Sequence, residues 1–300
     1  MRLLIITQVV DIEDSFLGFF VRWLEEFSKH TKQVEVICLR EGKHNLPENV
    51  RVHSLGKDAG VSRLKYTFNF YKYIWSLRHE YDAVFVHMNP EYVVLGGLLW
   101  RVLNKKIALW YTHKSVDTKL RLATFLSNII FTASKESFRL ASSKVHVMGH
   151  GIDTDFFSPD PGVVRGDWIL SVGRLSVSKR HDLAIQRATQ EGRMLRIAGD
   201  GPERARLEAV ADELNARVQF LGGLTQGQLR DEYRSAKYFI HTSETGSLDK
   251  VVLEALACGL PIVTNDPALK HLEFEGPHYV QENHSLKSLI PAILSTIQAI

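Results

Sequence analysis

Short apolar runs rich in β-branched residues alternate with longer segments of helical period along the chain. The predicted strands of the first half are Leu3–Thr7, Val34–Leu39, Val52–Leu55, Ala83–His87, Ile107–Tyr111, Ile129–Thr132 and Lys144–Val147. Helices are predicted between several of them, over Phe16–Lys29, Leu64–Arg78 and Glu91–Leu103. The strand runs are apolar throughout, which is expected of parallel strands with both faces covered.

The alternation stops over Gly149–Gly166, an aperiodic segment with glycines, prolines and aspartates that is predicted to be a linker. Afterwards the predicted strands are Trp168–Val172, Leu195–Ala198, Val218–Phe220, Tyr238–His241 and Pro261–Thr264. The predicted helices are Arg180–Thr189, Glu203–Asn215, Gln226–Ser235 and Lys250–Cys258. The fold class is therefore α/β, with two Rossmann-like domains facing a cleft, residues 1–155 and residues 156–300.

Composition narrows the functional classes. The 300 residues are 45% hydrophobic and 24% charged, as in an ordinary folded protein, and the net charge of +3 is too small to indicate nucleic acid binding. Cys38 and Cys258 lie far apart in apolar runs, which predicts reduced, buried thiols and a cytoplasmic location. The pattern of a signal peptide is absent, and so is any apolar run of about 18 residues, so no membrane span is expected.

Chemistry is expected at the turns that follow strands, because sheets of this kind bind ligands beyond the carboxyl ends of their strands. Gly173 ends one predicted strand, and Arg174 and Lys179 follow it before a helix. Two cations over such a turn suit a diphosphate, since arginine offers a planar fork of donors and lysine a mobile charge. A pair of solvated surface cations is the simpler interpretation of the same residues.

The sequence Gly199-Asp200-Gly201-Pro202 has the spacing of the first part of a dinucleotide-binding fingerprint. The third glycine is missing, with Arg204 in its place, and proline is typical of a first helical turn. A tight structural turn near a ligand is the better interpretation, and a hydride-transferring enzyme gains little support.

A glycine-containing loop, Gly246-Ser247-Leu248, precedes the predicted helix Lys250–Cys258, whose free amides can hold phosphate oxygens. Glu254 lies one turn beyond Lys250 on the same helix face. A carboxylate there can accept hydrogen bonds from both hydroxyls of a ribose, while the amides and Lys250 take a diphosphate. The alternative is an exposed helical ion pair worth about 0.3–0.5 kcal/mol. Asp249 is predicted to cap the helix.

Together these turns resemble the donor domain of family 4 glycosyltransferases, which are retaining enzymes of the GT-B fold (glycosyl transferases group 1). The matching stretches are S-V-G-R-L-x3-K-R-x-D, R-I-A-G-D-G-P-E-R, F-L-G-G and V-V-L-E-A-L-A-C-G-L-P-I-V-T, which cover most of Ser171–Asp266 in the family's order. The resemblance implies that Arg174 and Lys179 bind the donor diphosphate and that Glu254 binds the ribose. It also implies that backbone around Ser247 and Leu248 touches the terminal phosphate or the sugar.

The first half carries a weaker resemblance. Gly18 corresponds roughly to the family's glycine loop after the first strand, and His113 to its active-site histidine near the transferred sugar. A plain loop residue is the alternative for His113. Many relatives have two glutamates eight positions apart, but the position eight before Glu254 is Gly246. Either Glu244 reaches the sugar or this branch has no first glutamate, and we favour the second.

The resemblance implies retaining transfer of a sugar from a nucleoside diphosphate sugar to an acceptor hydroxyl, with the two domains closing around the donor. The acceptor can be lipid-linked, a polysaccharide or a small molecule. No clustered Asp-x-Asp or His/Cys ligand set argues for a metal site, so neither a metal ion nor a cofactor is expected besides the donor substrate. The alternatives are a sugar-nucleotide epimerase of similar architecture and an inactive nucleotide-sugar-binding protein.

The segment Arg63–Tyr81 mixes basic and aromatic side chains, which suits a helix in a lipid headgroup layer. The protein would then contact the inner face of the membrane peripherally. One stripe of this helix also falls at core spacing, and we favour burial of that stripe on the sheet over membrane contact: Leu64, Phe68, Tyr71 and Trp75.

The carboxyl end differs from the usual GT-B pattern. Proteins of that fold generally finish with a helix that crosses back onto the first domain. A single helical stretch, Ser285–Ile297, closes this sequence, so the crossover helix is expected to be absent or the chain shortened.

Overall fold

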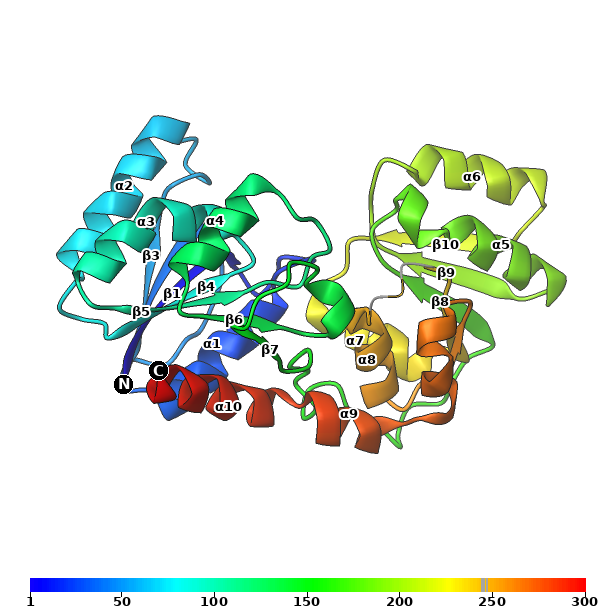
Figure 1. Ribbon diagram of the computed structural model, residues 1–300. Helices are drawn as coiled ribbons and strands as arrows, with labels where there is room; N and C mark the ends of the chain where they lie inside the picture. The colour runs from blue at the N-terminus through cyan, green and yellow to red at the C-terminus, as the bar shows by residue number, and fades with distance from the viewer. Residues whose placement is uncertain (244–245, 247) are drawn as a thin grey trace. The chain divides into compact units, whose positions relative to one another are not determined.

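The computed structural model describes residues 1–243, 246 and 248–300. The chain forms two compact units: unit 1 contains Met1–Gly151 together with Leu286–Ile300, and unit 2 contains Ile152–Ser285. Each unit is built on an open parallel sheet flanked by helices (Figure 1). The predicted α/β fold class with two Rossmann-like domains is confirmed.

Unit 1 has a seven-stranded sheet of order β3-β2-β1-β4-β5-β6-β7, in which all neighbouring strands are parallel. The strands are β1 (Arg2–Val10), β2 (Gln33–Glu41), β3 (Val50–Ser54), β4 (Ala83–His87), β5 (Lys106–Trp110), β6 (Ile129–Thr132) and β7 (Val145–Val147). Each overlaps a predicted run, because strands covered on both faces are largely apolar.

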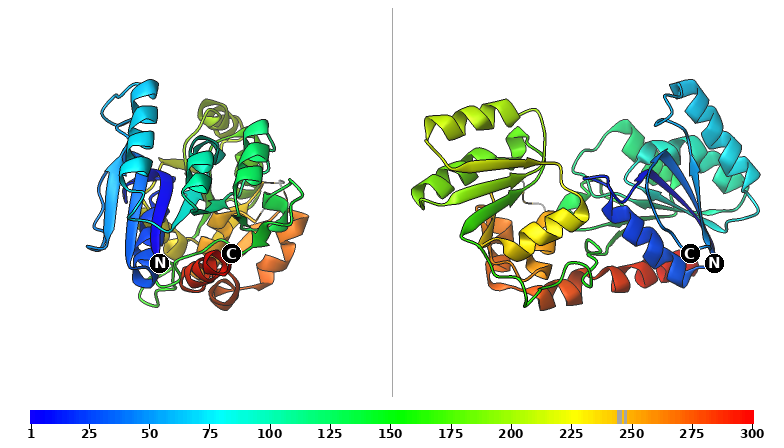
Figure 2. Two further views of the ribbon diagram at one scale, coloured as in Figure 1. Left: turned by 60° about the vertical axis from the view of Figure 1, so that its left-hand side comes forward. Right: turned by 180° about the vertical axis from the view of Figure 1, so that it is seen from behind.

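Alternate side chains of each strand enter separate cores on the two faces of the sheet. The helices of unit 1 are α1 (Phe19–His30), α2 (Arg63–Ser76), α3 (Pro90–Val102), α4 (Thr118–Leu126) and α10 (Leu286–Ala299), with the one-turn helix η1 (Lys135–Ser137). In β1, Leu3 and Ile5 pack with α1 and α10. Leu4 and Ile6 pack with α2, α3 and α4 on the other face. Figure 2 shows helices on both faces of this sheet.

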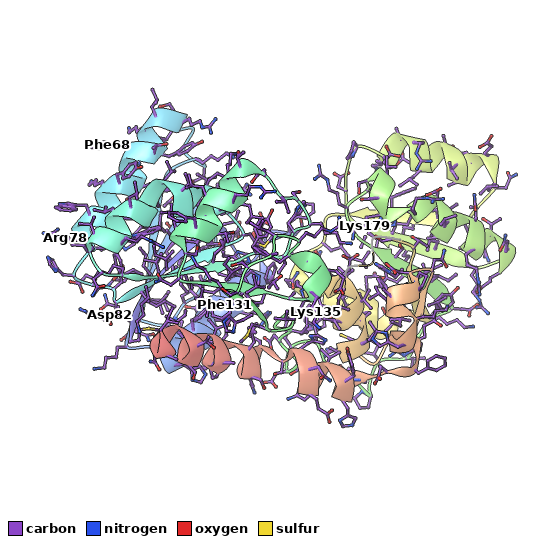
Figure 3. All side chains as sticks on the ribbon, viewed as in Figure 1. Phe68, Arg78, Asp82, Phe131, Lys135 and Lys179 are labelled. Carbon is purple, nitrogen blue, oxygen red and sulfur yellow. The ribbon has the colours of Figure 1, made fainter. Side chains whose placement is uncertain are left out.

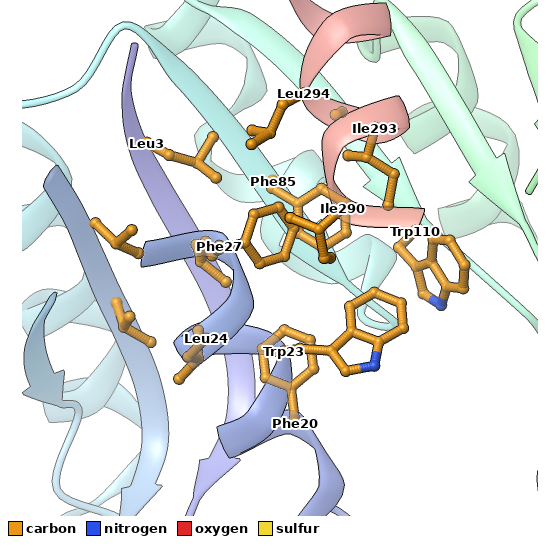
Figure 4. Close-up of a cluster of buried hydrophobic side chains, with 14 of the residues drawn as sticks. Leu3, Phe20, Trp23, Leu24, Phe27, Phe85, Trp110, Ile290, Ile293 and Leu294 are labelled. Atoms are coloured by element: carbon orange, nitrogen blue, oxygen red, sulfur yellow. The ribbon is translucent and has the colours of Figure 1, made fainter. Parts of the chain in front are cut away.

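Helix α10 belongs to unit 1, although it follows unit 2 in the chain. Ile290, Ile293 and Leu294 are buried in the core that α1 shares with the sheet (Figure 4). The indole of Trp23 in α1 donates to the Gly151 carbonyl at 3.1 Å beside this packing. The predicted second domain of residues 156–300 is therefore wrong for its last segment, and so is the expected absence of a crossover helix. The apolar face of α10 packs against α1.

Unit 2 has a five-stranded parallel sheet of order β10-β9-β8-β11-β12. The strands are β8 (Trp168–Val172), β9 (Met194–Ala198), β10 (Val218–Gly222), β11 (Tyr238–His241) and β12 (Ile262–Thr264). The helices are α5 (His181–Gln190), α6 (Arg204–Glu213), α7 (Gln226–Ser235), α8 (Lys250–Ala257) and α9 (Pro277–His284), with the 3-10 helices η2 (Val177–Lys179) and η3 (Pro267–Phe274). α5 and α6 pack in one core, and α7, α8 and α9 pack in the other.

The predicted linker is mostly part of unit 2. Phe157 is buried in a core of that unit. Arg165 donates to the carbonyls of Ala236 and Gly259 at 3.1 and 2.9 Å. The prediction of a linker over Gly149–Gly166 is wrong for most of this segment, because aromatic and guanidinium side chains anchor a backbone that has no period. The boundary between the units lies after Gly151.

Cys38 and Cys258 are buried free thiols, as predicted. Burial raises the pKa of each thiol to about 12, so neither is a reactive thiolate at neutral pH. Within the described residues, no helix combines the length and apolar character that crossing a membrane requires.

Replacing Ile293 by alanine should destabilise the protein by about 2–5 kcal/mol, because the side chain is fully buried and its loss leaves a cavity. Ile300→Ala is the control. Ile300 is 53% exposed, and its truncation should change the free energy of unfolding by less than about 0.5 kcal/mol. Urea unfolding followed by circular dichroism measures both variants. Equal, small effects would contradict the assignment of α10 to the core of unit 1.

Candidate functional site

The order of strands in unit 2 reverses between β8 and β11. From β8 the chain proceeds through β9 to β10 on one side, and then places β11 and β12 on the other. Open α/β sheets bind ligands in the crevice at the carboxyl ends of the strands where the order reverses. β8 ends at Val172 and β11 at His241, so the segments that begin at Gly173 and Thr242 border the candidate site.

Two glycines bring neighbouring turns of this edge into direct backbone contact. The Gly173 amide donates to the Ala198 carbonyl at 3.0 Å, and the Leu175 amide to the Asp200 carbonyl at 3.0 Å. A Cβ on Gly199 would lie 2.0 Å from the Gly173 oxygen, and the φ of Gly199 is +135°. Glycine alone permits this approach, so the predicted structural turn is confirmed.

An ion pair joins the turn after β8 to the segment after β11. Lys179, labelled in Figure 3, ends η2 and pairs with Asp249, the residue before α8. The same carboxylate oxygen accepts a hydrogen bond from His241 Nε2 at 2.9 Å. The Thr242 hydroxyl donates to the Lys179 carbonyl at 2.9 Å. The sheet reversal therefore carries a connected polar network.

The sequence predicted that Asp249 caps α8, and this prediction is wrong. Asp249 occupies the N-cap position, but its side chain accepts no hydrogen bond from the helix amides. Burial would raise the pKa of this carboxyl, yet the hydrogen bond from His241 and the charge of Lys179 lower it to about 2. A charge-assisted bond to a lysine is stronger than a bond to a neutral amide, which explains the choice of partner.

Glu254 lies on α8 and is 1% exposed. Lys250 binds Oε1 of Glu254, and the Tyr233 hydroxyl donates to Oε2 at 3.2 Å. Burial, followed by the charge of Glu254, raises the pKa of Tyr233 well above its usual range, so the hydroxyl keeps its proton. The predicted pair exists, but Glu254 is buried and the exposed alternative is wrong. Each carboxylate oxygen has a further lone pair for a ligand hydroxyl.

The other predicted residues of unit 2 flank this network. Arg174 is exposed just beyond β8 and forms no ion pair within the part of the chain that the structure describes. Gly246 has a φ of +63°, and its amide donates to Asp266 Oδ2 at 2.6 Å. Leu248 packs against a core of unit 2. Two predicted loop positions lie outside the described residues: Glu244 and Ser247.

Two predicted residues lie in unit 1. His113 is exposed beyond the carboxyl end of β5, and its Nδ1 accepts from the Ser115 amide at 3.2 Å. Gly18 precedes α1, where a Cβ would lie 2.5 Å from the Asp14 oxygen. Glycine at position 18 therefore allows a compact turn after β1. The functional roles of both residues remain predictions.

Sequence reasoning missed three histidine and tyrosine side chains of this region. His241 ends β11, and a polar residue at a strand's carboxyl end was a signal that could have found it. Tyr233 lies 21 residues before Glu254 in another helix, and no sequence period links the two. His181 begins α5, and its Nδ1 lies 3.0 Å from the Ser171 hydroxyl. Burial lowers the pKa of His181 to about 4, so its ring is neutral.

Two protein families match the chain. Glycosyl transferases group 1 matches residues 160–293, and Glycosyl transferase 4-like matches residues 9–144. The chain is 31% identical to the GDP-mannose-dependent alpha-mannosyltransferase of Mycobacterium tuberculosis over 49% of this chain and 39% of the relative. It is 31% identical to the phosphatidylinositol N-acetylglucosaminyltransferase gpi3 subunit of Schizosaccharomyces pombe over 42% of this chain and 29% of the relative. The matches thus span well under half the length of these relatives.

Solved structures share the fold. HepE of Anabaena, in complex with UDP and glucose, has a TM-score of 0.75 and 17% identity, and the match covers 100% of both chains. Sucrose-phosphate synthase of Thermosynechococcus elongatus has a TM-score of 0.67 and 16% identity, covering 99% of this chain and 91% of that one. At these identities the likeness shows the fold alone, which is that of GT-B proteins.

The low pKa of Asp249 predicts a pH-dependent contribution to stability. A carboxyl whose pKa falls from 3.8 to about 2 on folding stabilises the protein above a pH of about 4, and this contribution is lost as the pH falls toward 2. The unfolding free energy of Asp249→Asn should therefore lie furthest below wild type at neutral pH and approach it in acid. Urea unfolding at a series of pH values measures the gap. The control is Asp231→Asn, whose carboxylate is 65% exposed. A difference in unfolding free energy between wild type and Asp249→Asn that does not change with pH would contradict the prediction. A difference that shrinks in acid for Asp231→Asn as well would also contradict it.

Proposed function

Because the chain belongs to the glycosyl transferases of group 1, with a first half of the glycosyl transferase 4-like type, we propose that it moves a sugar from a nucleoside diphosphate sugar to an acceptor hydroxyl. The observation that carries this proposal is the Lys179–Asp249 pair at the strand reversal of unit 2. The pair brings a cation and the amino end of α8 together at the edge where such sheets bind ligands. GDP-mannose appears in the name of the mycobacterial relative, and UDP is bound in HepE, so both bases are candidates.

In this proposal each polar group binds one part of the donor. Lys179, Arg174 and the amino end of α8 bind the diphosphate, because the two cations and the positive end of the helix dipole attract an anion. The buried carboxylate of Glu254 accepts hydrogen bonds from the ribose hydroxyls. Lys250 and Tyr233 hold that carboxylate in place. The loop of Gly246, Ser247 and Leu248 touches the terminal phosphate or the sugar.

The proposed chemistry follows from the charge that the reaction creates. Breaking the anomeric bond adds negative charge to the departing diphosphate, and fixed cations stabilise that charge more in the transition state than in the ground state. We propose retention of configuration, no requirement for a metal ion, and a place for His113 near the transferred sugar, as the family resemblance implies. Among the described residues, no group of three or more His, Cys, Asp or Glu side chains could hold a metal ion.

Lys179→Ala should lower kcat/KM for the sugar donor by about 100-fold or more, which is the usual loss when one preorganised charge-stabilising group is removed. Lys237→Ala is the matched control, since Lys237 pairs with Asp167 at 2.9 Å away from the network and should be dispensable. Transfer from UDP-sugars and GDP-sugars to a panel of acceptors measures activity, and circular dichroism checks folding. Wild-type turnover in Lys179→Ala would remove the charge-stabilisation argument.

The same assays separate the alternative functions. An epimerase would isomerise the nucleotide sugar when incubated with the donor alone. An inactive binding protein would bind the donor and turn over none of the acceptors.

We further propose that unit 1 contacts a membrane surface through α2, α3 and α4. The stripe of α2 that the sequence favoured for the core is exposed, from 41% for Tyr71 to 85% for Leu64. Phe70 and Ile74 fill the core in its place, so core packing is the wrong interpretation of that stripe. The exposed side chains need another partner or remain in water.

The exposed apolar surface continues onto the neighbouring helices. Leu98 and Val102 of α3 and Phe125 of α4 are 69, 83 and 68% exposed. The three helices together carry one carboxylate, Glu91, against six cations: Arg63, Lys65, Lys72, Arg101, Lys119 and Arg121. Exposed aromatic side chains among cations suit anionic lipid headgroups. A lipid-linked acceptor would then lie at the surface where the protein binds, and the reaction would take place in the cytoplasm.

Trp75→Ser should weaken binding to phosphatidylglycerol vesicles about tenfold or more, because burying a large apolar side chain contributes about 1.5–3 kcal/mol. Phe274→Ser is the control. Phe274 is 88% exposed in unit 2, and this substitution removes a similar apolar area. Co-sedimentation at low salt, with phosphatidylcholine vesicles for comparison, measures binding. Failure of the wild-type protein to bind anionic vesicles would end the membrane proposal.

A further inference from the structure

The cation best placed for a diphosphate is already engaged in the ligand-free protein. Lys179 pairs with Asp249, and the two side chains are only 25% and 19% exposed. A lysine at this depth needs an anionic partner, because removing an unpaired charge from water is costly. Asp249 meets that need, but it also places a negative charge where an anionic ligand is expected.

A chain of hydrogen bonds holds the Asp249 carboxylate independently of Lys179. His241 Nε2 donates to it at 2.9 Å, and His241 Nδ1 lies 3.2 Å from the Thr264 hydroxyl. The Thr264 oxygen in turn accepts from the Asp266 amide at 3.1 Å. Asp266 Oδ2 accepts from the Gly246 amide at 2.6 Å, so the chain reaches the loop before α8. Asp249 therefore keeps a partner if Lys179 leaves.

We propose that Asp249 is an internal competitor of the donor: it neutralises Lys179 in the ligand-free protein, and the donor diphosphate replaces it as the partner of Lys179. This inference rests on the proposed function. Lysine suits such an exchange, because its ammonium is a compact charge on a flexible stem with three donors. Asp249 suits it because His241 still pairs with the carboxylate after the exchange. The Asp249 side chain does not cap α8, and the amino end of a helix attracts phosphate oxygens.

The exchange has a thermodynamic consequence. Part of the attraction between Lys179 and the diphosphate is spent on breaking the existing ion pair, so Asp249 lowers the affinity for the ligand. Removing its charge should raise that affinity, provided that Lys179 is present. A residue that only positioned Lys179 for binding would have the opposite effect, since its loss would weaken binding.

Titration calorimetry with UDP and GDP tests the inference in a double-mutant cycle. Asp249→Asn should bind the nucleotide about five- to tenfold more tightly than wild type, within the usual range of coupling between two ligands of one group. In the Lys179→Ala background the same substitution should give a clearly smaller gain. Asp200→Asn removes an exposed carboxylate beyond the neighbouring strand β9 and should leave the affinity within about twofold of wild type.

The outcomes distinguish the inference from the function it rests on. If wild type binds neither nucleotide, the proposed function fails. If wild type binds but Asp249→Asn binds equally or more weakly, the competitor role is overturned. An equal gain in nucleotide affinity from Asp249→Asn in the Lys179→Ala background, or from Asp200→Asn, would show that the loss of any negative charge raises the affinity. That result would also overturn the competitor role of Asp249. For a variant of lower stability, the rise in melting temperature with saturating nucleotide compares the affinities instead. A ligand that binds only the folded state raises the stability of that state.

Discussion

A charge removed from water must be paired, and this constraint organises the candidate site. Two carboxylates of unit 2 are largely buried at its carboxyl edge, and each is met by a lysine and one further donor. Asp249 is paired with Lys179 and His241, and Glu254 with Lys250 and Tyr233. These pairings fix where a cation and an acceptor lie before any ligand arrives. The exposed Arg174 lies outside these pairings and can bind an anion.

The topology of the sheet makes these pairings possible. Lys179 and Asp249 are separated by 70 residues, and they meet because the strand order reverses between β8 and β11. The glycine turns beside them permit backbone contact that any side chain would block. In unit 1 the strand order also reverses, between β1 and β4, and the two faces of its sheet differ. One face is covered by α1 and α10, and the other carries helices with exposed apolar and basic side chains.

Local features were predictable from the sequence, and long-range ones were not. Mostly apolar runs identified the strands, because strands covered on both faces are largely apolar, and helical spacing identified the Lys250–Glu254 pair. The short helices α4 and α9 span 9 and 8 residues, about two turns, too few for a clear period. The docking of α10 depends on a surface of α1 that is distant in sequence. The partner of Asp249, either its own helix or Lys179, depends on residues that are distant in sequence. The choice of the buried stripe of α2 depends on such residues too.

The central claim is that the carboxyl edge of unit 2 binds a nucleoside diphosphate through this paired network. A crystal structure of the protein with UDP or GDP bound tests it most directly. We expect phosphate oxygens within hydrogen-bond distance of Lys179 and the amino end of α8, with the ribose hydroxyls on Glu254. A nucleotide bound elsewhere, with no contact to Lys179 or Glu254, would contradict this binding mode.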